Sequence, residues 1–83
     1  MTEITMYTTS GCGFCVRAKA LLKQRSLPFA EINLDGDPNF RATLLDLTGG
    51  RTVPQIVIDG KPIGGYTELW QLDKAGELVK LSA

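Results

Sequence analysis

The sequence predicts one α/β domain in which a four-stranded mixed sheet carries helices on both faces. Its 83 residues suffice for a single small domain, which we expect to span residues 1–83. Short segments that alternate polar and apolar residues are interleaved with segments whose apolar residues recur every three or four positions. The first pattern is typical of strands and the second of amphipathic helices, and their order is β-α-β-α-β-β-α.

The first half of the chain predicts two strands joined by a helix. Residues 3–8 alternate polar and apolar side chains, and residues 29–34 do so again. Pro28 marks the start of the second strand, because helices tend to end before the residue that precedes a proline. Such a unit is right-handed, so the two strands should be parallel. The helix between them is expected to place four apolar side chains on one face, namely Phe14, Ala18, Leu21 and Leu22.

A second helix is expected between residues 37 and 50. Asp37 fits its N-cap and Pro38 its first helical position, because a proline there needs no hydrogen-bonded N–H. A Gly-Gly pair at 49–50 should end it. Its apolar face would carry Phe40, Leu44 and Leu47.

The remainder of the chain predicts a hairpin and a last helix. An Asp-Gly pair at 59–60 separates two strand-like runs, residues 55–58 and 61–63, and this dipeptide favours a tight hairpin turn. The last helix follows a Gly-Gly pair at 64–65, and Thr67 is its expected N-cap. One side of that helix should carry Leu69, Leu72 and Ala75.

The composition excludes several classes of function. Nine basic and nine acidic residues leave no formal net charge, which argues against electrostatic binding of a nucleic acid or a membrane surface. No apolar run approaches the roughly 18 residues of a membrane span, and the first residues lack a signal-peptide pattern. The chain has no histidine, so Ser-His and Cys-His catalysis and the commonest zinc ligand are excluded.

The two cysteines, Cys12 and Cys15, form a C-x-x-C motif at the predicted start of the first helix. Free N–H groups and the positive end of the helix dipole favour a thiolate there. In such settings the pKa of a cysteine falls from about 8.5 to roughly 3.5–7.5, so Cys12 is a candidate nucleophile. Cys15 lies one turn further in, should be more buried, and can displace a partner captured by Cys12.

Two other interpretations of the C-x-x-C motif remain open. The motif begins many zinc sites, but a structural site needs four ligands, so this chain would have to share the metal with a second chain. Alternatively, both cysteines are small buried apolar residues. Gly11 and Gly13 favour an exposed turn over a core position.

Three segments resemble the signature segments of glutaredoxins: S-G-C-G-F-C at 10–15, R-T-V-P-Q at 51–55 and I-G-G-Y-T-E-L at 63–69. The resemblance is to the dithiol class, with C-G-F-C in place of the usual C-P-Y-C, and it covers nearly the whole chain. It implies a thioredoxin-like fold. It also implies a cytoplasmic, monomeric oxidoreductase that uses glutathione to reduce protein–glutathione mixed disulfides and protein disulfides. Cys12 would be the nucleophile and Cys15 the resolving cysteine.

The resemblance also implies a glutathione site. Pro54 would be cis and lie beside Cys12, and the backbone of Val53 would pair with the tripeptide like a short strand. The start of the last helix suits the γ-glutamyl carboxylate, and Arg41 or else Arg51 suits the glycyl carboxylate. The expected glutathione contacts are Phe14, Arg41, Thr52, Val53, Pro54, Gly65, Tyr66 and Thr67.

Each of these residues also has a plainer interpretation. Pro54 can be an ordinary strand-edge proline, and an exposed arginine is more often a solvated charge than a ligand contact. Phe14 and Tyr66 can be packing residues, and for Trp70 we expect packing rather than binding.

Two departures from the family pattern leave a second function open. Gly13 replaces the usual proline of the motif, and Thr9 replaces a lysine that commonly precedes the nucleophile by three residues. Glutaredoxins without that proline can bind a [2Fe-2S] cluster between two subunits, with one cysteine per chain, here Cys12, and two glutathiones as ligands. A third hypothesis is an electron donor fed by thioredoxin reductase. The segment 65–68 argues against it, because it resembles a glutathione site.

Overall fold

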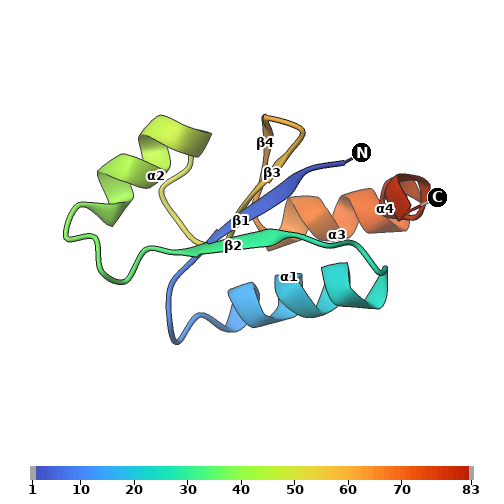
Figure 1. Ribbon diagram of the computed structural model, residues 1–83, viewed down its shortest axis with the longest axis horizontal. Helices are drawn as coiled ribbons and strands as arrows, with labels where there is room; N and C mark the ends of the chain where they lie inside the picture. The colour runs from blue at the N-terminus through green and yellow to red at the C-terminus, as the bar shows by residue number, and fades with distance from the viewer. Residues whose placement is uncertain (1, 83) are drawn as a thin grey trace.

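The computed structural model describes residues 2–82 and has the α/β architecture that the sequence predicts (Figure 1). Its four strands are β1 (Ile4–Thr8), β2 (Ala30–Asn33), β3 (Gln55–Ile58) and β4 (Lys61–Gly64). Its helices are α1 (Gly13–Gln24), α2 (Phe40–Thr48), α3 (Tyr66–Lys74) and α4 (Glu77–Ser82). No helix in residues 2–82 has both the length and the apolar character of a membrane span.

The strands form one mixed sheet in the order β2-β1-β3-β4. As predicted, β1 and β2 are parallel, while β3 is antiparallel to both β1 and β4. The β3–β4 hairpin turns at Asp59 and Gly60, whose φ angles of 50° and 81° are those that an Asp-Gly turn accommodates. These directions bring the ends of β1, β2 and β4 and the start of β3 to the same edge of the sheet.

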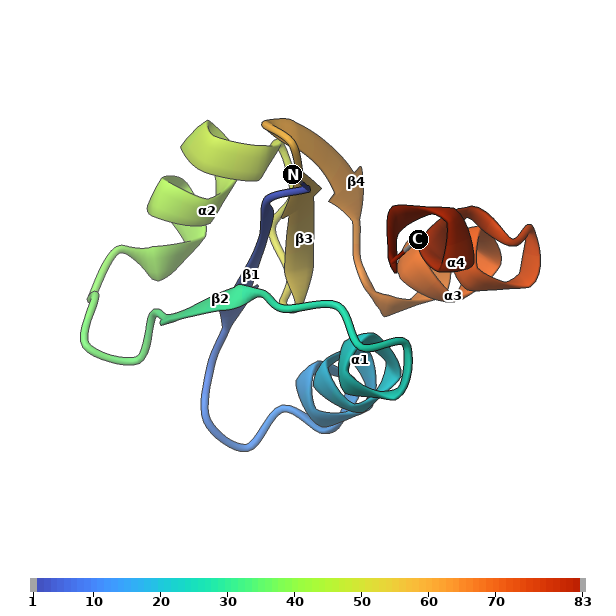
Figure 2. The ribbon, with the colours of Figure 1, turned by 45° about the vertical axis from the view of Figure 1, so that its right-hand side comes forward.

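Helices cover both faces of the sheet, with α1 and α3 on one face and α2 on the other (Figures 1 and 2). The main core lies between the sheet and the pair α1–α3, because alternate residues of β1 point there and are buried. This core contains Ile4, Met6, Ala18, Leu22, Leu27, Ile56, Leu69 and Leu78. On the other face, Leu44 of α2 is fully buried.

The buried face of α1 differs from the predicted one. Its buried residues are Cys15, Ala18 and Leu22, whereas the side chain of Phe14 is 57% exposed. The spacing of three and four residues is therefore right, but the face begins at Cys15. Phe14 lies about 100° round the helix from Cys15 and reaches the surface.

The predicted start of α2 is wrong by two residues. Asn39 is the N-cap, and the helix begins at Phe40. Asp37 instead stabilises the preceding turn, since its carboxylate accepts hydrogen bonds from the Asn39 N–H at 2.8 Å and the Thr43 hydroxyl at 2.7 Å. The expected apolar position Leu47 is 50% exposed, whereas the expected stop is confirmed: Gly49 is the left-handed C-cap with φ 79°.

The last part of the chain holds two helices rather than one. Gly65, not Thr67, is the N-cap of α3, and the Glu68 carboxylate accepts the Gly65 N–H at 3.0 Å. That helix ends at Lys74, which leaves Ala75 exposed. A break at Gly76 (φ 81°) starts the short α4, whose Leu78 is fully buried in the core.

Candidate active site

The candidate site lies at the sheet edge where β1 and β4 end and β3 begins. The segment 9–12 follows β1 and leads into α1, so it places Cys12 at that edge. The segment Thr52–Pro54 immediately precedes β3, and Gly65 immediately follows β4. Because β3 is antiparallel to both neighbours, the three segments meet in space although they are far apart in sequence.

Cys12 is the N-cap of α1, and its Sγ accepts a hydrogen bond from the backbone N–H of Cys15 at 3.1 Å. The first turn of that helix has no acidic residue to oppose a negative charge on the sulfur. Cys12 is half-buried while Cys15 is only 1% exposed, which confirms that the second cysteine is the more buried one. A disulfide joins the two, with their Cα atoms 5.2 Å apart.

The segment before β3 lies against Cys12. The Val53–Pro54 peptide bond is cis, as the resemblance implies, and Pro54 is buried. The carbonyl oxygen of Val53 lies 3.8 Å from the Sγ of Cys12. The backbone at Val53 is therefore next to any group that forms a disulfide with Cys12.

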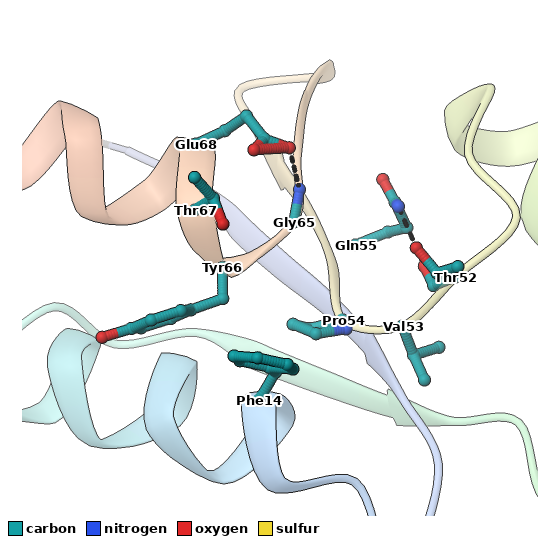
Figure 3. Close-up of a pocket in the computed structure, with 9 residues that line it drawn as sticks. All are labelled: Phe14, Thr52, Val53, Pro54, Gln55, Gly65, Tyr66, Thr67 and Glu68. Atoms are coloured by element: carbon teal, nitrogen blue, oxygen red, sulfur yellow. Dashed lines mark hydrogen bonds between the residues drawn. The ribbon is translucent and has the colours of Figure 1, made fainter.

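A cleft of about 200 Å³ opens beside this segment (Figure 3). Phe14 and Tyr66 stack at its wall, with their ring centroids 6.0 Å apart and their planes at 29°. Seven of the eight expected glutathione contacts line it, and these seven come from three separate segments of the sequence. The lining residues are Phe14, Thr52, Val53, Pro54, Gln55, Gly65, Tyr66, Thr67 and Glu68.

The start of α3 forms the far wall of the cleft. The backbone N–H groups of Tyr66 and Thr67 lie in the first turn, where a helix provides no internal acceptor. Position 65 favours glycine for a steric reason: a Cβ there would lie 3.2 Å from the carbonyl oxygen of Pro54. The cleft thus combines an apolar aromatic wall with free N–H donors, a combination that suits a small ligand carrying a carboxylate.

Comparison with known proteins shows which family has this sequence pattern and this arrangement of the site. The family model described as Glutaredoxin matches residues 4–63. The chain is 44% identical over 81 residues to a glutaredoxin of Pseudomonas aeruginosa, covering 98% of this chain and 96% of that protein. It is 41% identical to glutaredoxin 3 of Escherichia coli strain K12, covering 98% of both. The chain belongs to the glutaredoxin family.

A solved structure, the buckwheat glutaredoxin–glutathione complex, has the same fold as this glutaredoxin domain, with a TM-score of 0.85 at 34% identity. The match covers 96% of this chain and 76% of that one, and it confirms the predicted thioredoxin-like fold. Family membership and the Cys12–Cys15 pair together make the protein a thiol–disulfide oxidoreductase.

Arg41 is the one expected contact that does not line the glutaredoxin cleft. Its side chain is exposed, its guanidinium lies 5.2 Å from the centroid of the Phe40 ring, and its Nη1 donates to the carbonyl of Arg51 at 3.4 Å. Arg41 therefore contacts the chain just before Thr52. Arg51, the alternative, is exposed and also outside the lining.

Sequence reasoning missed two lining residues, Gln55 and Glu68. The side-chain amide of Gln55 donates to the carbonyl of Thr52 at 2.9 Å and so holds the segment before β3 (Figure 3). Glu68 places a carboxylate at the start of α3, where it caps Gly65. Its signal was present in the sequence, because a Glu three residues after an N-cap can accept the backbone N–H of that N-cap, which is one half of a capping box.

The loop before Cys12 is fixed to the turn that follows β2. The backbone N–H of Ser10 donates to both carboxylate oxygens of Asp35, at 3.0 and 3.1 Å. A hydrogen bond from the Ser10 side chain, together with those from its backbone N–H, holds the pKa of Asp35 below its ordinary value. The charged carboxylate of Asp35 fixes the loop two residues before Cys12.

The residues of one chain fit an iron–sulfur cluster only in part. Within residues 2–82, no group of three or more Cys, His, Asp or Glu side chains is arranged to hold a metal ion. A [2Fe-2S] cluster needs four thiolates, and of the two cysteines only Cys12 is accessible. A second chain and outside thiols would have to supply the other three ligands.

Proposed function

We propose that this protein uses glutathione to reduce protein–glutathione mixed disulfides and protein disulfides, with Cys12 as the nucleophile. One relationship carries the proposal: the half-buried sulfur at the start of α1 lies 3.8 Å from the Val53 carbonyl, at a cleft with free N–H donors. The structurally similar buckwheat protein is a glutathione complex, which supports the choice of ligand. A cytoplasmic location fits, because that compartment keeps glutathione reduced.

The first step is attack by the Cys12 thiolate on the glutathione sulfur of the mixed disulfide. The new bond joins Cys12 to glutathione, and the bond between glutathione and the target cysteine breaks. The target leaves as a thiolate and takes up a proton. The target is thereby reduced, and Cys12 now carries the oxidation as a mixed disulfide with glutathione.

A second glutathione thiolate then attacks the glutathione sulfur bound to Cys12. Oxidised glutathione forms, and Cys12 returns as a thiolate, so two glutathione molecules have supplied the two electrons. Within this scheme the start of α3 binds the γ-glutamyl carboxylate through the N–H groups of Tyr66 and Thr67. The backbone of Val53 pairs with the tripeptide, and the ring of Phe14 closes the cleft.

Protein disulfides follow a route that also uses Cys15. Cys12 attacks the target and forms a mixed disulfide, and Cys15 then loses its proton and attacks the Cys12 sulfur. The target leaves as a dithiol, and the Cys12–Cys15 disulfide remains, which is the state present in the structure. Two glutathione molecules then reduce that disulfide.

Serine variants of the two cysteines test the proposal. The substrate is a glutathionylated peptide, and the readout is the release of peptide thiol in the presence of glutathione. We expect Cys12→Ser to abolish turnover and Cys15→Ser to keep most of it, because only Cys12 takes part in that route. On an intact protein disulfide, both variants should fail to release a free product. If Cys15→Ser were the inactive variant on the glutathionylated peptide, the assigned roles would be wrong.

A second candidate function is a [2Fe-2S] cluster shared by two chains, which the open space at Gly13 favours. A Cβ built at Gly13 meets no atom within 4 Å, so nothing crowds the approach to Cys12 from that side. Anaerobic reconstitution with iron, sulfide and glutathione tests it. A brown dimer that forms with Cys15→Ser but not with Cys12→Ser would support the cluster. A colourless monomer would exclude it.

A further inference from the structure

The first turns of α1 carry a second hollow, outside the cleft. It is lined by Gly13, Phe14 and Arg17 and has a volume of about 220 Å³; we call it the α1 hollow. Gly13 and Arg17 are four residues apart and therefore lie on one face of the helix. Phe14 lines both the cleft and the α1 hollow, so its 57% exposed ring separates the two.

Arg17 gives this hollow an uncompensated positive charge. Its guanidinium lies 5.5 Å from the centroid of the Phe14 ring, a cation–π contact in which the ring has no net charge to neutralise the arginine. None of the ion pairs among residues 2–82 includes Arg17. By contrast, Lys19 on the same helix pairs with Glu31 at 3.1 Å. The helix itself, Gly13–Gln24, contains no acidic residue.

The position of the hollow relative to Cys12 decides what can reach it. In the proposed reaction the target cysteine is bonded to the glutathione sulfur that Cys12 attacks. Only that one sulfur atom then separates the target cysteine from Cys12, so the target chain must lie next to Cys12. The glutathione occupies the cleft on one side of Phe14. The residues that flank the target cysteine then have the surface of α1 beside Cys12 available to them, and this surface begins at Gly13.

We propose that the α1 hollow binds an acidic side chain of the target protein next to its reacting cysteine. Arg17 supplies two parallel N–H donors that match a carboxylate, and the Phe14 ring shields that contact on one side. Acidic targets would thus be selected over basic ones. The proposal rests on the proposed glutathione-dependent activity and adds the class of protein that the activity prefers.

The test compares two glutathionylated peptides that differ only in one flanking residue, Asp or Lys. A third substrate, the mixed disulfide of glutathione with 2-mercaptoethanol, has no flanking residue. For the wild-type protein we expect kcat/KM to be about three- to fivefold higher for the Asp peptide at low salt, as befits an exposed ion pair. High salt should reduce this preference.

Variants of Arg17 test whether this residue causes the preference for the Asp peptide. Arg17→Gln should remove the preference and Arg17→Glu should reverse it, while both keep the wild-type rate on the 2-mercaptoethanol disulfide. The matched control is Lys23→Glu, which makes the same charge change on an exposed residue nearly two turns further along α1. It should keep at least half of the preference for Asp.

Two results would overturn the proposal. The first is a wild-type protein that reduces both peptides equally. The second is an Arg17 variant that slows all three substrates alike, because Arg17 would then act on glutathione or on Cys12. Failure of the wild-type protein on the 2-mercaptoethanol disulfide is a different result: it would refute the glutathione-dependent activity itself.

Discussion

The backbone N–H of Cys15 donates a hydrogen bond to the Sγ of Cys12 at 3.1 Å, so the proposed resolving residue also stabilises the proposed nucleophile. This bond arises because Cys12 is the N-cap of α1 and Cys15 lies three residues into the helix. A serine at position 15 keeps the N–H and loses only the thiol. The two roles of Cys15 can therefore be separated experimentally.

A methyl group at Gly65 should weaken the binding of glutathione. A Cβ there would lie 3.2 Å from the Pro54 carbonyl oxygen, so the segment before β3 must shift by a few tenths of an ångström. We expect Gly65→Ala to raise the KM for a glutathione mixed disulfide roughly three- to tenfold, a fraction of the hundredfold cost of a misplacement of about 1 Å. Steady-state kinetics measure this.

The matched control for that variant is Gly36→Ala. A Cβ at Gly36 meets no atom within 4 Å, and its φ lies outside the left-handed region. Its KM should equal that of the wild-type protein. An unchanged KM in Gly65→Ala as well would mean that the contact between Gly65 and Pro54 does not shape the proposed glutathione site.

The ion pair between Arg25 and Asp73 should make stability depend on pH. Arg25 Nε and Nη2 donate to the two carboxylate oxygens at 2.6 and 3.0 Å, linking the end of α1 to α3. The side-chain hydrogen bond from Arg25 lowers the pKa of Asp73 below its ordinary value of 3.8. The contribution is therefore complete above that value and is lost as the pH falls through the lower pKa of the folded state.

Urea denaturation at several pH values tests this ion pair. Asp73→Asn should be less stable than the wild-type protein at pH 7, and the difference should shrink below a pH of about 4. Glu77→Gln is the control, because it removes an ion pair with Lys80 that lies at the surface. The side chain of Glu77 is 49% exposed and that of Lys80 is 72% exposed. This control variant should change stability less. A deficit in Asp73→Asn that stays constant down to acid pH would argue against the pair.

The short helix α4 should be necessary for a stable core. Leu78 is fully buried, and its truncation leaves a cavity, so Leu78→Ala should lower the free energy of unfolding by about 2–5 kcal/mol. Leu47→Ala makes the same chemical change at a side chain that is 50% exposed and should cost less than about 1 kcal/mol. Equal effects of the two variants would show that α4 does not pack as described.

Much of this site could be predicted because its parts are fixed by local rules. The Asp-Gly turn at 59–60 sets the register of the β3–β4 hairpin, so Pro54 before one strand and Gly65 after the other must lie close together. The C-x-x-C motif after a strand places Cys12 at a helix start. These constraints act over a few residues, and the sequence displays them directly.

The errors occur where tertiary contacts outweigh local preference. Thr67 is a better N-cap by type than Gly65, but the hydrogen bond from the Gly65 N–H to Glu68 and the end of β4 place the start of the helix at Gly65. The helix α4 has only six residues, too few for a clear periodicity, and depends on the burial of Leu78. Arg41 lies on α2, and the placement of that helix over the sheet is not encoded within α2 alone.

The pKa of Cys12 in the reduced protein is the most direct test of the proposed nucleophile. The measurement is a pH titration of thiolate ultraviolet absorbance in Cys15→Ser, in which Cys12 is the remaining thiol. The N–H at position 15 and the helix dipole should place the pKa at least about one unit below the ordinary value of about 8.5, so that at least about half of the sulfur is ionised at pH 7.5. A pKa at or above about 8.5 would contradict the account.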